Sequence, residues 1–373
     1  MSKAWFLFVT AALVLAGCAN APVYKPGPKT LPPNWDTELG PAHELENVVL
    51  PRPTNAIPGV AVAAPTNPPP RSNPAPLTTV DTGMVSLSRW AAQNGFGSVR
   101  VLPLLPTVAY TVKTSFGSFT VRAGSLAAYW DRLEVRLGFP PQQVGDQIFL
   151  HALDIKKVLA PLANGLSVVT PANRLVVIDP GHGGSNTGTR NVVTGRYEKD
   201  YTLDWARRLK PLLEQSGWRV MLTRTNDVEM KLPERVAFAE AQHANLFLSL
   251  HFNATGDGSQ GPAGLETYCL TPAGMPSSIT RGYADDPRLV LPNNAYDGEN
   301  LRYAVRLHRS LLRVNGNNDR GVRHARFLDV LAGQQRPAVL IEAGYLSNPE
   351  EARRVADAEY RQKLAEAVAK ALE

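Results

Sequence analysis

Three side chains of the types that bind metals lie next to short apolar segments between residues 175 and 255. His182 lies in the glycine-rich stretch DPGHGG, Glu198 follows the polar stretch SNTGTRNVVTGRY, and His251 lies in SLHFNA. Two histidines and one carboxylate are a ligand set of catalytic zinc, whose fourth position is left to water. Because zinc lowers the pKa of that water to about 7, the three residues predict a metal-dependent hydrolase.

A fourth candidate, Glu342, interrupts the apolar run AVLIEA. A carboxylate in such a run is costly unless it is paired or lies in a site at the end of a strand. Near a metal-bound water it would act as a general base and then as a general acid toward the leaving amine. The structural alternative is a salt-bridged glutamate, which would take no part in the reaction.

Each metal-ligand candidate has a structural alternative as well. His182 and His251 would otherwise be hydrogen-bonded histidines that follow strands, and Glu198 would be a carboxylate that interacts with a helix dipole. The three residues occur together in one chain, and this combination favours the metal site over three separate structural roles.

Three further residues are secondary candidates. Arg224, in LTR, fits a structural role as well as a functional one, and Asn253 is a candidate for orienting ligands or substrate. His324 lies in the basic run GVRHAR, for which a solvated loop is favoured over the wall of a cleft that binds an anionic glycan-peptide. Cys269 is expected to be a small buried residue.

The elements that would position these residues follow from alternating apolar and amphipathic segments between residues 173 and 373. The expected strands are RLVVID, WRVMLT, LFLSLH, GLETYCL and AVLIEA, and the expected helices lie near 198–216, 232–243, 299–315 and 349–372. This order predicts an α/β fold, with a largely parallel mixed sheet flanked by helices. In such sheets the reactive residues gather at the carboxyl ends of the strands.

The motifs DPGHGG, SLHFNA and IEAGYLSN, with Glu198 between the first two, resemble the catalytic domain of the zinc-dependent N-acetylmuramoyl-L-alanine amidases. The resemblance covers residues 174 to about 370. It implies that His182, Glu198 and His251 bind Zn²⁺ and that Glu342 is the catalytic acid/base. It also implies that the substrate is peptidoglycan, cut between N-acetylmuramic acid and L-alanine.

Two other functions are alternatives. A zinc carboxypeptidase acting on wall peptides would carry the motif H-x-x-E, but the residue three positions after His182 is Ser185. The H-E-x-x-H motif of zinc metalloproteases does not occur in the sequence either. A catalytically silent peptidoglycan-binding or divisome scaffold protein would be favoured by loss of a ligand or of Glu342, and all four residues are present. A muramidase would need two carboxylates and no metal, so the combination of two histidines with a glutamate does not favour it.

Some amidases of this family carry a helix, after the last histidine strand, that blocks the zinc site until a partner removes it. Residues 271–299 of this chain are rich in proline, glycine and asparagine, which predicts a loop instead of a helix. We therefore do not expect inhibition of that kind, and the sequence identifies no activator protein.

The N-terminus is expected to direct the protein to a membrane surface. Lys3 precedes the apolar run Ala4 to Leu15, which is too short to span a bilayer but fits a signal peptide over residues 1–17. The run ends in LAGC, which resembles the lipobox of bacterial lipoproteins and implies lipidation of Cys18. The residue after Cys18 is Ala19 and not aspartate, which in bacterial lipoproteins favours the outer membrane over the inner. The expected location is therefore the periplasm, with a lipid anchor in the outer membrane. An ordinary signal peptide is the alternative.

Two regions are expected between Cys18 and the catalytic domain. Residues 19–80 include 15 of the 31 prolines of the chain and are predicted to form a linker. Residues 83–165 are predicted to form a small α+β domain, in which MVSLSRWAAQNG is a strand and helix, VAYTVKTSFGSFTVRAGS a hairpin, and GDQIFLHALDIKKVLAPL a strand and helix. The layout resembles the N-terminal stalk domain of copper amine oxidases, and no copper ligands are implied.

Composition limits the classes of function. The 44% hydrophobic and 19% charged residues of the 373-residue chain are ordinary for a globular protein. The formal net charge of +6 suits an anionic partner, which wall polymer or a membrane surface would provide. Since lysine and arginine are scattered and no nucleic-acid motif occurs, we expect no nucleic-acid partner. Two cysteines exclude a disulfide framework or a cysteine-rich zinc site.

Overall fold

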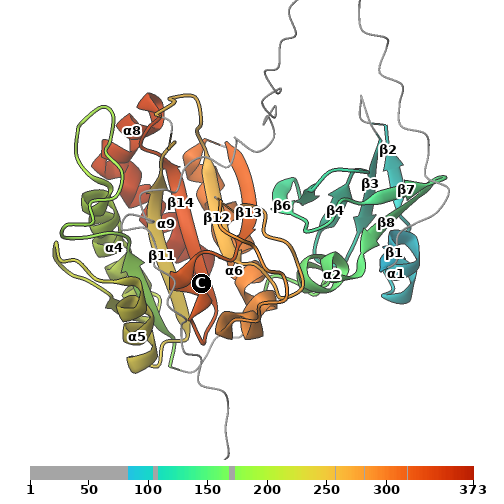
Figure 1. Ribbon diagram of the computed structural model, residues 1–373, viewed down its shortest axis with the longest axis horizontal. Coiled ribbons are helices and arrows are strands. Elements are labelled where there is room, and N and C mark those ends of the chain that lie inside the picture. Colours follow the sequence, from blue (N-terminus) through green and yellow to red (C-terminus); the bar gives the residue numbers. More distant parts are fainter. Residues whose placement is uncertain (1–82, 104–107, 168–172, 257, 281, 317) are drawn as a thin grey trace, which may run out of the picture. The chain divides into compact units, whose positions relative to one another are not determined.

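The computed structural model describes residues 83–373, except 104–107, 168–172, 257, 281 and 317 (Figure 1). The predicted signal peptide, Cys18 and the proline-rich linker lie outside the described residues. Within the described part of the chain, none of the helices is long and apolar enough to cross a membrane.

The C-terminal half is built on a mixed sheet whose strands run side by side in the order β10-β9-β11-β14-β12-β13 (Figure 1). Strands β9, β10, β11 and β14 are mutually parallel, β12 is antiparallel to β14, and β13 is parallel to β12. Their bounds are β9 Leu175–Pro180, β10 Arg219–Leu222, β11 Leu246–Asn253, β12 Leu265–Leu270, β13 Asp319–Ala325 and β14 Ala338–Tyr345. The predicted largely parallel mixed sheet is confirmed.

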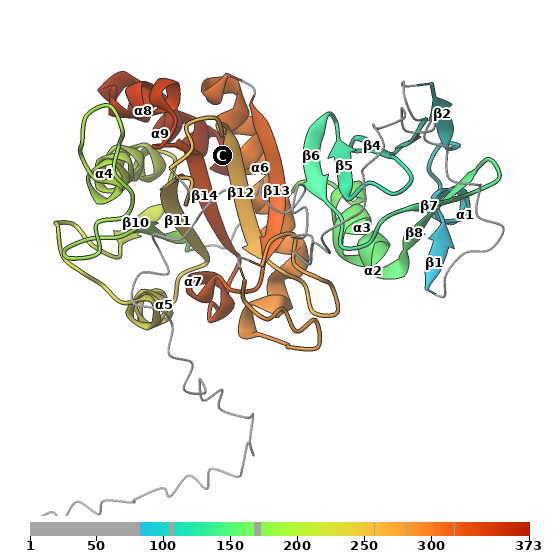
Figure 2. The ribbon, with the colours of Figure 1, turned by 45° about the horizontal axis from the view of Figure 1, so that its top comes forward.

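Helices cover both faces of this sheet. Figure 2 shows α4, α9 and α6 on one side of the strands and α5 and α7 on the other. The bounds are α4 Glu198–Gln215, α5 Leu232–Ala241, α6 Asp297–Asn315, α7 Asp329–Ala332, α8 Pro349–Ala356 and α9 Ala358–Leu372. The predicted helices are confirmed, although Asp357, whose side chain caps α9, divides the last one into α8 and α9.

The central strands owe their position to their composition. Every residue of β9, β11 and β14 is buried, as expected for parallel strands that are covered by helices on both faces. On the side of α4, helix residues at a spacing of four, Tyr201, Trp205, Leu209 and Leu213, are buried against the sheet. The parallel order brings the carboxyl ends of β9, β11 and β14 to one edge of the sheet.

Strand β13 contradicts the prediction for the basic run at 321–326. The run forms most of a buried strand, and His324 is only 3% exposed, so it neither lies in a solvated loop nor lines a cleft. Its arginines are compensated inside the fold, since Arg323 lies 3.4 Å from the Glu266 carboxylate and Arg326 pairs with Asp285. The compensating acids are distant in sequence, which is why the run alone suggested exposure.

The segment after β12 leaves the sheet far from the carboxyl ends of β9, β11 and β14. Because β12 is antiparallel to β14, Leu270 at its carboxyl end lies toward the opposite edge. The described residues of 271–291 contain no helix, which confirms the predicted loop there. The prediction is wrong for the last residues, because Pro292–Tyr296 form a 3₁₀ turn and α6 begins at Asp297.

Residues 84–163 contain the elements that the sequence predicted, namely a strand and helix, a hairpin, and a strand entering helical turns. They also contain strands at 100–102, 127–130, 133–136 and 142–144 that it did not predict. Strands β1, β8 and β7 make a small sheet, and β2 to β6 continue the large sheet through the register pair Val135 and Val322. The bounds are β1 Met84–Ser86, α1 Leu87–Gln93, β2 Arg100–Leu102, β3 Ala109–Lys113, β4 Ser118–Val121, β5 Ala127–Trp130, β6 Leu133–Arg136, β7 Gln142–Val144, β8 Gln147–His151, α2 Ala152–Asp154, a π-helical turn Ile155–Leu159 and α3 Ala160–Ala163.

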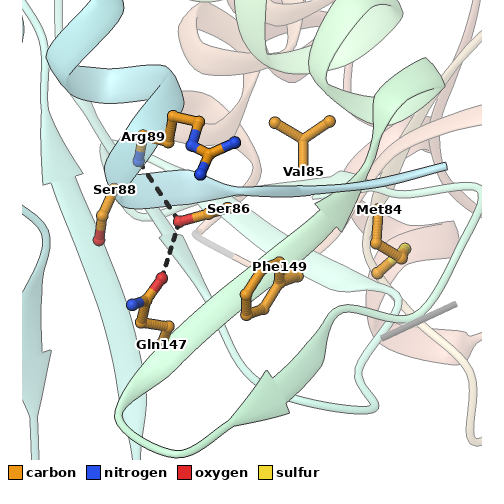
Figure 3. A pocket seen from close by; sticks show the side chains of 7 residues that line it. All are labelled: Met84, Val85, Ser86, Ser88, Arg89, Gln147 and Phe149. Atoms are coloured by element: carbon orange, nitrogen blue, oxygen red, sulfur yellow. Dashed lines mark hydrogen bonds between the residues drawn. The ribbon is translucent and has the colours of Figure 1, made fainter. Parts of the chain in front are cut away.

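A shallow cavity of about 570 Å³ lies on this N-terminal part (Figure 3). The Ser86 hydroxyl donates to Gln147 at 3.1 Å and accepts from the Arg89 backbone at 3.4 Å. The lining comes from β1, α1 and β8 and consists of Met84, Val85, Ser86, Ser88, Arg89, Gln147 and Phe149. None of these seven lining residues is a histidine, a cysteine or an acidic residue, so this lining offers no side chain of the types that bind metals.

Candidate metal centre

The loop after β9 is held by two buried arginines. Arg235 pairs with Asp179 at 2.6 Å and donates to the carbonyl oxygen of His182 at 2.8 Å. Arg224 donates to the carbonyl oxygens of Pro180 at 2.9 Å and Gly181 at 2.8 Å, which assigns it the structural role. Since both guanidinium groups are nearly fully buried, the loop that carries His182 has a fixed path.

The structure brings together the three predicted ligand side chains. Nε2 of His182 lies 3.0 Å from Oε2 of Glu198, and Nδ1 of His251 lies 3.1 Å from Oε1 of the same carboxylate. One ligand atom from each residue lies within 4.8 Å of the others, and all three residues are buried. They come from the loop after β9, the first turn of α4 and the end of β11, which is the sheet edge where the sequence placed them.

Two of the three side chains, His182 and Glu198, are oriented by further contacts. Oδ1 of Asn186 accepts from Nδ1 of His182 at 2.8 Å, which leaves Nε2 of that ring turned toward Glu198. The Phe252 and Thr189 backbone N–H groups donate to the two oxygens of Glu198, at 2.9 and 3.1 Å. Burial would raise the pKa of Glu198, but the two histidine rings more than offset this and hold that pKa well below its usual range.

Two glycines make room for these rings. A Cβ at Gly181 would lie 2.2 to 2.6 Å from three ring atoms of His251, and a Cβ at Gly188 would lie 2.6 Å from both Glu198 and His182. Gly188 also has a φ of 64°, a backbone conformation that residues with a side chain rarely adopt. The sequence indicated the glycine-rich stretch around His182, whereas nothing in it marked Gly188.

Glu342 lies next to the cluster. In β14 it is the register partner of His251 on the parallel strand β11 and of Glu266 on the antiparallel strand β12. Register partners on neighbouring strands place their side chains on the same face, so Glu342 and His251 point to the same side of the sheet. Glu342 is fully buried, and the geometry places a carboxylate beside the candidate ligands.

The other candidates have other positions. Asn253 donates from Nδ2 to Glu266 at 2.8 Å and accepts from the Ala254 backbone at 2.9 Å, so its amide is engaged within the protein. His308, which the sequence did not single out, hydrogen-bonds Thr267 and Asp319. Cys269 is free and buried, as predicted.

Sequence reasoning missed Asn186, Arg235 and Glu266. Asn186 lies four residues after His182, and such a polar side chain near a histidine candidate was a usable signal. Arg235 and Glu266 act across 56 and 54 residues of sequence, on Asp179 and with Arg320 respectively, and only the fold brings them to these partners.

Comparison with known proteins decides the family. Residues 176–373 match the family model for N-acetylmuramoyl-L-alanine amidases of the Amidase_3 type. The chain belongs to this family. The matched segment contains all four residues of the cluster and its neighbour, His182, Glu198, His251 and Glu342.

Individual relatives each match about half of this chain. N-acetylmuramoyl-L-alanine amidase AmiC of Escherichia coli O6:H1 is 29% identical over 218 residues, covering 52% of this chain and 51% of AmiC. LytC of Bacillus subtilis is 34% identical, covering 52% of this chain and 34% of LytC. Among solved structures, AmiC2 of Nostoc punctiforme is 32% identical and covers 54% of this chain and 96% of that chain, with a TM-score of 0.44. The match thus spans about half of AmiC and a third of LytC.

Proposed function

We propose that this amidase-family protein hydrolyses the amide bond between N-acetylmuramic acid and L-alanine in peptidoglycan, and that it binds Zn²⁺ to do so. The carrying observation is the buried His182–Glu198–His251 cluster with Glu342 as the register partner of His251. Family membership and the amidase names of the relatives support the choice of bond.

The residues present fit zinc. Two imidazole nitrogens and one carboxylate are a ligand set of catalytic zinc sites, and the hydrogen bond from His182 Nδ1 to Asn186 leaves Nε2 available for a metal. The glycine-lined space around the rings would not admit a Cβ, so the loop is built to keep these three side chains close. When bound, zinc polarises a carbonyl group and lowers the pKa of a water molecule.

The side chains of the chain itself then have distinct roles. His182, Glu198 and His251 hold the ion. Glu342 takes the proton of the attacking water and returns it to the departing alanine nitrogen, because it is the carboxylate that lies beside the ligands without belonging to the ligand set. The Arg224 and Arg235 guanidinium groups fix the loop that presents His182.

Digestion of purified peptidoglycan, followed by mass analysis of the products, tests the proposal. We expect peptides with a free L-alanine amino terminus and intact glycan strands, with the products absent in strong chelator. New reducing ends would instead indicate a glycosidase, and release of a C-terminal D-alanine would indicate a carboxypeptidase. A zinc-loaded, folded protein that releases none of these products would be the scaffold alternative.

We propose in addition that Cys18 is lipidated and that the catalytic domain acts in the periplasm, anchored to the outer membrane. The LAGC motif at the end of a short apolar run supports this location. Palmitate labelling of the wild type should be strong, and labelling of Cys18→Ala should be at background. Equal labelling of the two would refute the anchor and leave the catalytic proposal intact.

A further inference from the structure

A second buried polar cluster lies on the face of the sheet that carries Glu342. Its centre is Glu266, a fully buried carboxylate that is the register partner of Glu342. Oε1 of Glu266 accepts from Arg320 Nε at 2.9 Å, and Oε2 accepts from Asn253 Nδ2 at 2.8 Å and from the Tyr268 hydroxyl at 2.9 Å. A carboxylate with this many donors is fixed in position.

A glycine with positive φ helps to build the cluster. The register between β12 and β13 shifts from Leu265 opposite Asp319 to Thr267 opposite Val322, so β13 has one extra residue at Gly321, where φ is 92°. This bulge lets Arg320 and Arg323, three residues apart, both reach Glu266.

The carboxylate of Glu266 remains charged in this cluster. Burial would raise the pKa of Glu266, but Arg323 and Arg320 and the hydrogen bonds from Tyr268 and Arg320 hold that pKa below its usual value. Glu266 is therefore an ionised anchor with its charge compensated, which distinguishes it from a residue that must gain and lose a proton.

The hydrogen bond from Asn253 to Glu266 crosses a strand. Strand β14 lies between β11, which carries Asn253, and β12, which carries Glu266. Asn253 lies two residues after His251, and Glu266 lies beside Glu342, so the bond passes over β14 next to Glu342. Since the Asn253 oxygen accepts from the Ala254 backbone, the direction of its amide is fixed as well.

We infer that Asn253 and Glu266 form a strap across β14 that positions Glu342 relative to the candidate ligand His251. This inference rests on the proposed function, because it assigns the strap to the residue proposed as acid/base. Asn253 and Glu266 are positioning residues, which act through Glu342 and are not ligands. Outer partners of this kind typically change activity 10- to 100-fold when removed.

The substitution Asn253→Ala tests the strap without leaving a buried charge unpaired, because Arg320 and Arg323 remain with Glu266. We expect kcat on peptidoglycan to fall about 10- to 100-fold, with KM and the zinc content unchanged. Asn293→Ala is the matched control. Asn293 is an equally buried amide that donates to the Arg336 carbonyl at 2.7 Å, in the segment before α6. It should keep the wild-type kcat.

The variant Glu266→Gln is the second test, and it should combine with Asn253→Ala less than additively, because both cut the same strap. Crystal structures of the zinc-loaded proteins give a readout besides activity. Glu342 should have one carboxylate position in the wild type and in Asn293→Ala, and a displaced or split position in Asn253→Ala. This comparison decides the inference even if the wild type fails to cleave peptidoglycan.

Three outcomes would overturn the strap. The first is a folded Asn253→Ala protein with wild-type kcat and an unmoved Glu342. The second is loss of zinc in Asn253→Ala, which would place the effect at the ligands. The third is an equal loss of kcat in Asn293→Ala, which would mark a general response of the domain to loss of a buried amide.

Discussion

His182 has a φ of 62°, in the left-handed region that residues with a side chain rarely adopt. Such a conformation costs on the order of 1–3 kcal/mol and persists only where the surroundings enforce it. Here the surroundings are Arg235, which bonds the His182 carbonyl, and Asn186, which bonds its ring. The strain lies at the residue whose ring must face Glu198, so it belongs to the construction of the site.

Single substitutions distinguish the role of Glu342 from that of Glu198. Glu342→Gln should lose roughly 10²- to 10⁴-fold in kcat, because general acid–base help is worth about that much, while zinc content stays near one per chain. Glu198→Gln should lose zinc and activity together, because its carboxylate lies 3.0–3.1 Å from both histidine rings. Metal analysis and kinetics on the same preparations measure both quantities.

The controls for this pair are thermal unfolding curves and His251→Ala, which should behave as Glu198→Gln does. A fully active Glu342→Gln enzyme would move the acid/base role to another residue and leave the ligand assignment standing. Full activity of His251→Ala in strong chelator would contradict the ligand assignment itself.

Tyr345, the last residue of β14, offers a test of how one buried hydroxyl affects stability. Its phenol is fully buried, and its hydroxyl has no hydrogen-bond partner among the described residues. Tyr345→Phe should therefore leave the free energy of unfolding unchanged or raise it by up to about 1 kcal/mol, because no hydrogen bond is lost. Denaturant unfolding measures the change.

Tyr268→Phe is the matched substitution, because the Tyr268 hydroxyl donates to Glu266 at 2.9 Å. It should lower the free energy of unfolding by about 1–3 kcal/mol, since a buried carboxylate loses a donor. If Tyr345→Phe destabilises the protein as much as Tyr268→Phe does, the Tyr345 hydroxyl has a partner and the premise is wrong.

At the scale of elements, the sequence predicted β9, β11 and β14 because continuous apolar runs require burial on both faces. It missed β13, because three arginines and a histidine in DRGVRHAR give no such run. Those charges are buried only because Glu266 and Asp285 reach them from other parts of the chain. The ligands were predictable from motifs, whereas the strap required the register between strands.

The loop after β9 gives the element-scale prediction. Gly181→Ala should cost at least about tenfold in zinc affinity, because the new Cβ would lie 2.2–2.6 Å from the His251 ring and displace it. The backbone of Gly181 has no positive φ, so the effect arises from contact and not from backbone strain. Titration of the apoprotein with zinc measures the affinity.

Gly261→Ala is the control, because a Cβ at Gly261 meets nothing within 4 Å and that glycine also has no positive φ. Its zinc affinity should equal that of the wild type. An unchanged affinity in Gly181→Ala would show that the His251 ring can move without loss of the site, which would weaken the argument from close packing.

At the scale of the whole molecule, the dependence of stability on pH reflects two buried groups, Asp154 and His324, whose pKa values shift in opposite directions. Burial raises the pKa of Asp154 to about 6, although the Gly138 and Phe139 backbone N–H groups act in the other direction. Burial lowers the pKa of His324 to about 4. Asp154 lies in α2, in the N-terminal part, and His324 lies in β13.

The two groups contribute slopes of opposite sign. Between pH 4 and 6 the folded state holds a proton on Asp154 that the unfolded state has lost, so this group makes stability fall as pH rises. Between about pH 4 and 6.5 the unfolded state holds a proton on His324 that the folded state lacks, so this group makes stability rise with pH. Each group changes the free energy of unfolding by about 3 kcal/mol over this range, because one pKa unit corresponds to about 1.4 kcal/mol.

Because the two terms nearly cancel in the wild type, each must be measured by removing one group. Relative to Asp154→Asn, the wild type should lose about 3 kcal/mol of unfolding free energy from pH 4 to 6.5, and relative to His324→Gln it should gain about as much. Denaturant unfolding of the three proteins at several pH values gives both differences. A flat difference for either variant would mean that its group titrates alike in the folded and unfolded chains, contrary to the burial of both side chains.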